Sequence, residues 1–199
     1  MIITIVALSD IIHNDLSSPN AALLLASHMV ENEAKLVWCN WLDRAEDWQD
    51  KINLTRLAKH HQFESNQARF IAAEQLNASN DEQQILLMAI TQMQQYLQGL
   101  RYGFDLPIDI SLGTAFQQSV WKALQEIPHG ETISYAALAQ RVNNPKGFRA
   151  VANANGKNPF SIIIPCHRVI SSDGKLGGYT GGLDKKEYLL ALEGSTYKV

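Results

Sequence analysis

Two apolar runs separated by a polar segment predict a pair of strands in the first third of the chain. The runs "AALLLAS" and "KLVWCNW" are short and apolar, and the second is rich in β-forming residues. The polar segment "HMVENEA" separates them, which favours two strands joined as a hairpin or meander. The chain then turns polar, and "LAKHHQFESNQARFIAAEQL" is expected to form two helices.

A long helix is predicted over residues 79–100. It opens with Ser79 three residues before Glu82, the spacing of a capping box. Apolar residues then recur at helical intervals, which predicts one buried face; they are Leu86, Ile90, Met93, Leu97 and Leu100. The following "FDLPIDISL" is expected to be a linker with a short extended piece, so the boundary between two modules is placed near Pro107.

Three shorter helices are predicted in the second half. The segment "TAFQQSVWKALQEIPHG" begins with a capping box of Thr114 and Gln117 and ends at its proline and glycine. In "SYAALAQRV", Ser134 is the expected N-cap. The segment "KGFRAVANANG" forms a second short helix that closes on Gly156. Two short helices across a tight polar turn indicate a helix-turn-helix motif.

The second helix of this motif has an unusual composition. A helix that reads the major groove presents Asn, Gln, Ser or Arg side chains to base edges, whereas here Ala150, Ala152 and Ala154 surround Arg149. Two interpretations stay open. The helix packs against its own domain, or its small side chains let the backbone come close to another surface.

The segment "SIIIPCHRVI" places a thiol and an imidazole beside an apolar run. The β-branched residues 162–164 predict a buried strand that Pro165 ends. Cys166 and His167 would then lie at the exit of a rigid element. A cysteine among apolar residues is often an inert small hydrophobe, and a thiol with its ordinary pKa is mostly protonated at neutral pH, so a nucleophilic Cys166 needs help to ionise.

The composition is that of a globular protein. The chain has 199 residues, 46% of them hydrophobic, enough to bury a core as one domain or two. No apolar stretch approaches 18 residues, and "MIITIVAL" meets Asp10 too early for a secretory signal. We therefore expect a cytoplasmic protein without a membrane partner. Its two cysteines, Cys39 and Cys166, are too few for a disulfide framework, so Cys166 is expected to be a free thiol.

The net charge of −3 hides an asymmetry between the two halves. Residues 1–110 carry seven Lys or Arg and fourteen Asp or Glu, whereas residues 111–199 carry ten and six. Between Thr132 and Ser172 every charged side chain is basic; these are Arg141, Lys146, Arg149, Lys157 and Arg168. A phosphate contact is expected here if anywhere in the chain.

These residues together resemble a known family. The segment "PCHRVI", preceded by "RAVANANGKNP" and followed by "GYTGGLDKKEYLLALEG", is similar to the active-site region of the O6-alkylguanine-DNA alkyltransferases. The resemblance extends from about Leu106 to Gly194. It implies an α/β protein with a variable N-terminal α/β domain over residues 1–106, containing a short antiparallel sheet. The second domain, 107–199, would be mostly helical and carry the helix-turn-helix and the active-site cysteine.

The resemblance also implies a reaction. Cys166 would take an alkyl group from guanine O6 and keep it as a thioether, so each molecule would act once. His167 would act on the thiol through a water, Glu193 would orient the imidazole, and Tyr135 would donate toward the leaving base. No cofactor is implied, and no metal, because the zinc-binding members need cysteines that this chain lacks.

The implied partner is double-stranded DNA that contains O6-alkylguanine, with O4-alkylthymine as a further possible lesion, bound by a monomer. The base must leave the duplex to reach the thiol, and Arg149 would enter the stack in its place while the helix occupies the minor groove. The residues implied to contact DNA are Lys146, Arg149, Ala150, Asn158, Tyr179 and Thr180.

Two other functions remain open from the residues alone. A DNA-recognition protein without chemistry would share the fold but have its thiol replaced, and Cys166 is present. A hydrolase that uses Cys166 and His167 would need an oxyanion loop, and none is obvious in the sequence.

Overall fold

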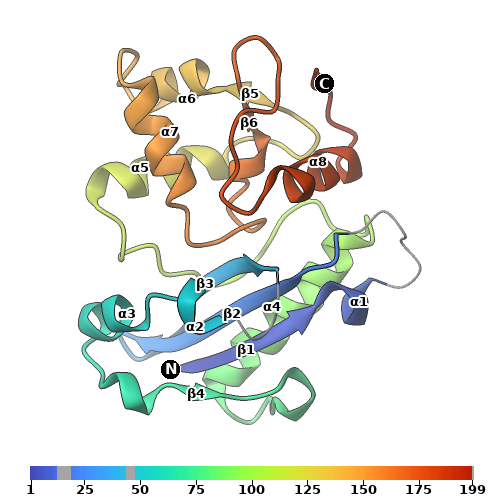
Figure 1. Cartoon of the computed structure of the whole chain (residues 1–199). Coiled ribbons are helices and arrows are strands. Elements are labelled where there is room, and N and C mark those ends of the chain that lie inside the picture. Colours follow the sequence, from blue (N-terminus) through green and yellow to red (C-terminus); the bar gives the residue numbers. More distant parts are fainter. Residues whose placement is uncertain (13–18, 44–47, 199) are drawn as a thin grey trace. The chain divides into compact units, whose positions relative to one another are not determined.

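The computed structural model describes residues 1–12, 19–43 and 48–198. The chain divides into two compact units, Met1–Leu112 and Gly113–Val199, and each is described by itself (Figure 1). The division falls a few residues beyond the expected boundary at 106/107. The reason is that residues 107–109 pair with the first unit, where the main chain of Leu36 bonds to that of Pro107 and Asp109.

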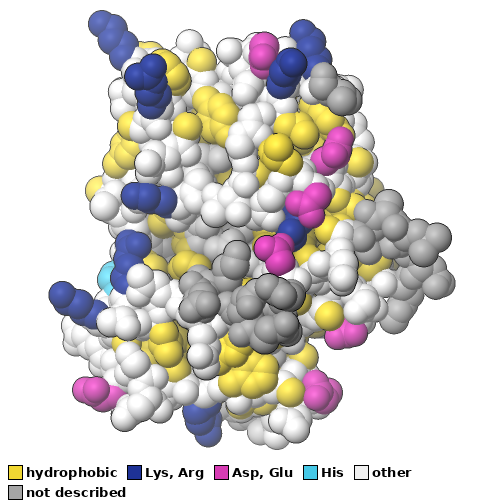
Figure 2. Space-filling view, in the orientation of Figure 1, with side chains coloured by type: hydrophobic (Ala, Val, Ile, Leu, Met, Phe, Trp, Pro, Cys, Tyr) yellow, Lys and Arg dark blue, Asp and Glu magenta, His cyan; other side chains and the backbone are white. Residues whose placement is uncertain are grey.

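The two units carry opposite net charge. The first holds seven basic and fourteen acidic residues, and the second ten and six. On the face drawn in Figure 2, Lys and Arg side chains lie as separate spots and do not merge into one patch. Electrostatic attraction for a polyanion is therefore expected to come from a few individual residues.

The first unit is built on a four-stranded sheet of order β3-β2-β1-β4. Strands β2 (Ala22–Val30) and β3 (Glu33–Leu42) form the expected antiparallel hairpin. Its two turn residues, Glu31 and Asn32, have φ of 52° and 66°, the left-handed conformation of a tight hairpin turn. Strand β1 (Ile2–Ala7), which the sequence analysis did not include, pairs antiparallel with β2. The sheet is mixed because β4 (Arg69–Phe70) runs parallel to β1.

Helix α4 (Asp81–Leu97) is the long helix predicted from the apolar repeat, and it buries Leu86, Met93 and Leu97. Its N-cap is Asn80, whose side chain accepts a hydrogen bond from the Gln83 main chain at 3.0 Å, so the predicted cap at Ser79 is wrong by one residue. Leu100, predicted to share the buried face, lies beyond the helix end and is 75% exposed.

Only one of the two helices predicted for residues 57–76 forms. Helix α3 (Leu54–His61) ends where Gln62 adopts a left-handed conformation with φ 57°. The chain then passes through the 3-10 turn η2 (Ser65–Gln67), strand β4 and the 3-10 turn η3 (Ala73–Gln75). Pairing of β4 with β1 therefore takes the place of the second helix. Two single-turn helices, α1 (Leu8–Ile11) and α2 (Trp48–Lys51), complete the described part of this unit.

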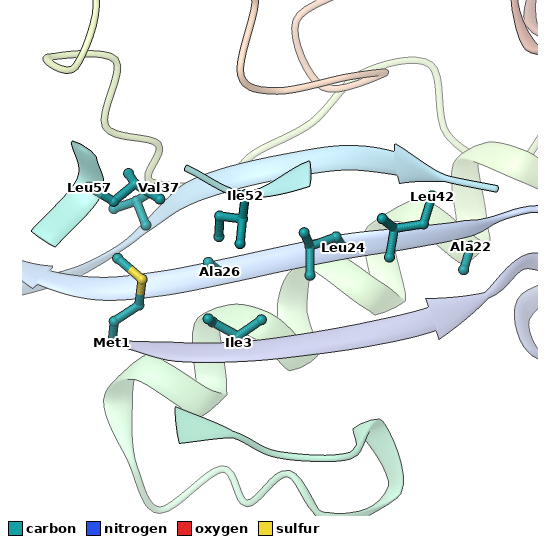
Figure 3. Close-up of a cluster of buried hydrophobic side chains, with 9 residues drawn as sticks. All are labelled: Met1, Ile3, Ala22, Leu24, Ala26, Val37, Leu42, Ile52 and Leu57. Carbon is teal, nitrogen blue, oxygen red and sulfur yellow. The ribbon is translucent and has the colours of Figure 1, made fainter. Parts of the chain in front are cut away.

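The core of the first unit lies against the sheet. Residues 22–27 of β2 are all buried, so this strand is covered on both faces. Figure 3 shows one side-chain cluster, to which strands β1, β2 and β3 and the α2–α3 region contribute. Its members are Met1, Ile3, Ala22, Leu24, Ala26, Val37, Leu42, Ile52 and Leu57.

The second unit is mostly helical, as expected. Helix α5 (Ala115–Gln125) starts with the predicted capping box of Thr114 and Gln117. Two residue pairs form a short parallel ladder between β5 (Ile133–Ser134) and β6 (Val169–Ile170). Helix α8 (Leu183–Leu192) follows near the C-terminus (Figure 1). Among the described residues, no helix is both long and apolar enough to cross a bilayer.

The predicted helix-turn-helix is formed by α6 (Tyr135–Arg141) and α7 (Phe148–Gly156). Ser134 caps α6 through a bond from the Ala137 main chain, as predicted. The turn between them includes Asn143 with φ 55°. Helix α7 is anchored to α5 because the Trp121 indole donates to the main-chain oxygen of Ala154 at 2.9 Å.

The strand predicted at residues 162–164 does not form. These isoleucines are buried, but the backbone turns there: Ile162 has φ 71°, and Ile164 donates to the oxygen of Phe160. Local turns and the side chain of Asn158 satisfy the backbone where a sheet ladder was expected. The apolar run therefore marks burial without marking a strand.

Candidate active site

The thiol of Cys166 lies at the start of a 3-10 turn, η4 (Cys166–Arg168), directly after Pro165. The residue is only 6% exposed, yet it lines a cavity of about 440 Å³. The cavity walls come from α6, α7 and the loop before α8; the lining residues are Tyr135, Ala152, Asn155, Gly156, Cys166, Ser171, Gly177, Gly178, Tyr179 and Thr180. A ligand that enters this cavity therefore meets the sulfur.

Asn158 lies next to the thiol and is itself buried. Its amide nitrogen donates to Sγ of Cys166 at 3.1 Å and to the main-chain oxygen of Ile164 at 2.8 Å. Its side-chain oxygen accepts from the Phe160 main chain at 2.9 Å. The resemblance grouped Asn158 with DNA contacts, whereas the structure places it inside, where it holds the turn and polarises the sulfur.

Lys186, on α8, is a second group that acts on the thiol, and it was not among the predicted site residues. Its side chain is fully buried, and Nζ donates to the main-chain oxygens of Val169, at 2.7 Å, and of Leu176. Burial lowers the pKa of Lys186 to about 8, and the charge of Cys166 opposes that shift. The ammonium is therefore mostly charged at neutral pH, within electrostatic range of the sulfur.

Opposing effects act on the pKa of the Cys166 thiol. Burial raises the pKa of Cys166, because a thiolate is poorly solvated inside the protein. The hydrogen bond from Asn158, the positive charge of Lys186 and a hydrogen bond from Tyr179 lower the same pKa. The net direction is upward, so the resting group is a thiol that needs a proton acceptor when it reacts.

His167 and Glu193 meet inside the second unit, as the resemblance implied. Nε2 of His167 lies 2.8 Å from Oε1 of Glu193, and neither side chain is exposed. Arg168 also binds this carboxylate, through Nε at 2.9 Å and the terminal nitrogen at 3.0 Å. Burial would raise the pKa of Glu193, but the hydrogen bonds and charges of His167 and Arg168 hold it well below its ordinary value.

This arrangement fixes the tautomer of His167. Because the Glu193 carboxylate is ionised and only accepts hydrogen bonds, Nε2 carries the proton and donates it. Burial lowers the pKa of His167, although Glu193 opposes the shift, so the ring is neutral. The lone pair is then on Nδ1, which has no hydrogen bond to any described residue. Nδ1 is the atom of this pair that can accept a proton.

Tyr135 and the loop before α8 line the same cavity as the thiol. The Tyr135 hydroxyl donates to the oxygen of Gly178 at 3.3 Å, and burial together with the charge of Cys166 raises its pKa. The hydroxyl of Thr180 donates to the oxygen of Gly156, at the end of α7, at 2.8 Å. The loop is thereby tied to the helix that forms the opposite wall.

The remaining predicted residues lie on the surface of the helix-turn-helix. Lys146, Arg149 and Ala150 are all exposed, and the Arg149 guanidinium lies 5.7 Å from the Phe148 ring centroid. The other side of α7 buries Val151 and Ala154. The packing interpretation therefore applies to the inward face of α7, and close approach to another surface stays a prediction for the exposed face.

The fold and the site together define a class: a helix-turn-helix protein with a polarised cysteine inside a cavity whose wall is the second helix of that motif. The profile of the 6-O-methylguanine DNA methyltransferase DNA-binding domain matches residues 115–195. A methylated-DNA–protein-cysteine methyltransferase of Methanosarcina acetivorans is 53% identical over 107 residues, which are 54% of this chain and 68% of that protein.

Solved structures agree with these matches. The crystal structure of Mycobacterium tuberculosis OGT in complex with DNA aligns with a TM-score of 0.69 and 32% identity, over 98% of this chain and 93% of that one. An O6-methylguanine-DNA methyltransferase from Pyrococcus kodakaraensis, 20% identical with a TM-score of 0.63, shares the fold. The chain thus belongs to the 6-O-methylguanine DNA methyltransferase family.

Proposed function

We propose that this protein repairs DNA by moving the alkyl group of O6-alkylguanine to Cys166. The observation that carries the proposal is the thiol itself, which lines a cavity of about 440 Å³ beside helix α7 of a helix-turn-helix. We assign DNA binding and catalysis to the unit Gly113–Val199, which contains all of these groups. The reaction needs a free thiol, so we assign it to a reducing compartment such as the cytoplasm.

The reaction is a direct displacement. The thiol proton passes to Nδ1 of His167 through a bridging water, and the sulfur attacks the alkyl carbon. The carbon–oxygen bond breaks, and its electron pair stays on the guanine, where Tyr135 supplies a hydrogen bond as charge develops. Cys166 is left as a thioether, which hydrolysis does not cleave, so each molecule reacts once.

A base in a duplex cannot reach a thiol that is only 6% exposed, so the nucleotide must rotate out of the stack. Arg149 is exposed on α7, and its side chain is assigned to the space that the base leaves. Ala150, beside it, is small enough for the helix to approach the minor groove. Lys146 is assigned to a phosphate, and Tyr179 and Thr180 to the loop against the extruded base.

The test is intact-mass measurement after incubation with DNA that contains O6-methylguanine. One methyl group should be gained, located on Cys166 by peptide mapping and absent from Cys166→Ser. Cys39→Ala is the matched control, because Cys39 is fully buried and burial raises its pKa to about 12, so its loss should leave transfer intact. An unchanged mass together with tight binding to alkylated DNA would instead identify a recognition protein without chemistry.

A further inference from the structure

Three side chains suited to metal binding meet in the first unit, apart from the cysteine site. His60 and His61 lie at the end of α3, and Asp109 lies in the segment that follows α4. One potential ligand atom from each lies within 4.8 Å of those of the other two. The His61 and Asp109 side chains are 6% and 10% exposed, whereas His60 faces solvent.

Hydrogen bonds fix both segments that carry these groups, helix α3 and the chain around Asp109. Arg56, one helical turn before His60, donates to the main-chain oxygen of Leu112 at 3.0 Å. The main chain of Asp109 donates to Leu36 of β3 at 2.9 Å. Helix α3 and the segment around Asp109 are thereby tied within one unit, so the three side chains meet through long-range structure and not through sequence proximity alone.

Ser111 orients both the carboxylate and one imidazole. Its main-chain nitrogen donates to Oδ1 of Asp109 at 2.9 Å, and its hydroxyl donates to Oδ2 at 2.8 Å. The same hydroxyl lies 2.8 Å from Nε2 of His60. A partner that fixes the direction of a ligating group is a common feature of protein metal sites.

The imidazole of His61 lies beside the carboxylate of Asp109. Nδ1 of His61 lies 3.8 Å from Oδ2 of Asp109, too far for a hydrogen bond. The imidazole and the carboxylate therefore lie beside each other without a direct hydrogen bond.

We propose that His60, His61 and Asp109 bind one divalent transition-metal ion, with Zn²⁺ as the best match. Imidazole and carboxylate are common zinc ligands, and a fourth position is left for water. Bonds of about 2.0–2.1 Å place tetrahedral ligand atoms about 3.3 Å apart, so side-chain rotations draw the three groups together. The absence of cysteine pairs in the sequence does not bear on this site, because it uses none.

Binding would clamp the end of α3 to the segment 108–111, which immediately precedes the second unit. The expected role is structural, since the cluster lies in the unit without the reactive thiol. A metal ion that binds the folded state but not the unfolded state raises the free energy of unfolding by mass action.

The test is calorimetric titration of the full chain with Zn²⁺ after removal of metals by a chelator. One equivalent should bind and raise Tm, and His60→Gln and Asp109→Asn should each weaken binding at least about tenfold. His129→Gln, in the second unit, is the matched control and should bind as the wild type does. His60 is exposed, so its replacement leaves the core intact, which far-UV circular dichroism checks.

Co²⁺ absorption separates this site from the thiol. Imidazole and carboxylate ligands give visible bands without a thiolate charge-transfer band, and Cys166→Ser should give the same spectrum. His60→Gln should lose the visible bands yet still accept a methyl group from DNA, so this proposal and the proposed function fail separately. A thiolate band, equal binding by the His60 and Asp109 variants, or no heat up to millimolar zinc would overturn the metal site.

Discussion

At the scale of single residues, the reactivity of the Cys166 thiol depends on neighbouring side chains whose effect on its pKa no local sequence pattern predicts. Cys166 is buried where its ionised form is disfavoured, and Asn158 and Lys186 offset part of that cost. Asn158 acts through a hydrogen bond of 3.1 Å, and Lys186 acts through its charge. The two contributions can be separated by pH, because the contribution of Lys186 depends on its own protonation and the hydrogen bond from Asn158 does not.

Replacing Lys186 with Met is expected to slow the reaction with free O6-methylguanine at least about tenfold at neutral pH, the effect of a rise of one unit in the Cys166 pKa. Lys186 has a pKa of about 8. Below pH 8 the Lys186 ammonium is charged and favours the thiolate. Above pH 8 the wild-type lysine loses its proton, so it no longer differs in charge from Met. The two pH–rate profiles should therefore differ most below pH 8 and converge above it.

The measurement is single-turnover kinetics over this pH range, below the Tm of both proteins. Lys186→Met also removes the donor to three main-chain oxygens, so a lower Tm is expected. Two profiles separated by the same factor at every pH would show that Lys186 is structural only.

The sequence predicted the thiol, His167, Glu193 and Tyr135 through family resemblance, and the structure places Tyr135 at the thiol cavity and pairs His167 with Glu193. No local sequence pattern marked Lys186, because a lysine in "DKKEYLL" normally indicates a solvent-exposed helix face. Arg168 was noted only as a basic residue, yet it is buried against Glu193. Burial of a charge depends on the tertiary partner and has no local pattern.

At the scale of elements, caps and periodic helices were predictable, and the thiol segment was not. Helices α4, α5, α6 and α7 follow from local spacing, and the caps of α5 and α6 were predicted as well. Residues 162–164 have the β-branched composition of a strand, but the side chain of Asn158 satisfies the main chain that a neighbouring strand would have paired. Local turns and one side chain together thus replace the expected ladder in that segment.

Helix α7 is the element on which base extrusion is expected to depend. Arg149→Ala should slow repair of duplex DNA about tenfold or more, since loss of about 1.4 kcal/mol of assistance has that effect. Reaction with the free modified base should change less than about twofold, because no extrusion is needed. Lys122→Ala, which removes an exposed charge from α5, is the control and should spare both rates. Equal losses on both substrates would remove the assigned role of Arg149.

At the scale of the whole molecule, charge limits how strongly DNA is held. Of the five basic residues between 132 and 172, Arg168 is buried against Glu193 and Arg149 is assigned to the base stack. Arg141, Lys146 and Lys157 remain exposed and are the residues expected to contact phosphates. Figure 2 shows no merged basic patch on the face drawn. The acidic first unit adds no attraction for a polyanion.

Three phosphate contacts predict a slope of about −2.7 for the logarithm of the DNA association constant against the logarithm of salt concentration. Lys146→Ala should reduce the magnitude of the slope by about one. Fluorescence anisotropy with a duplex oligonucleotide at several salt concentrations measures both. Affinity that does not change with salt would contradict binding through these residues.

The amide of Asn158 has a consequence for the protein after it has reacted. The same nitrogen meets the sulfur and two main-chain oxygens, those of Phe160 and Ile164. Once the sulfur has gained a carbon it is bulkier and can no longer ionise, while the two oxygens are unchanged. A reacted copy therefore differs from a fresh one first inside the fold, at the turn that this amide holds.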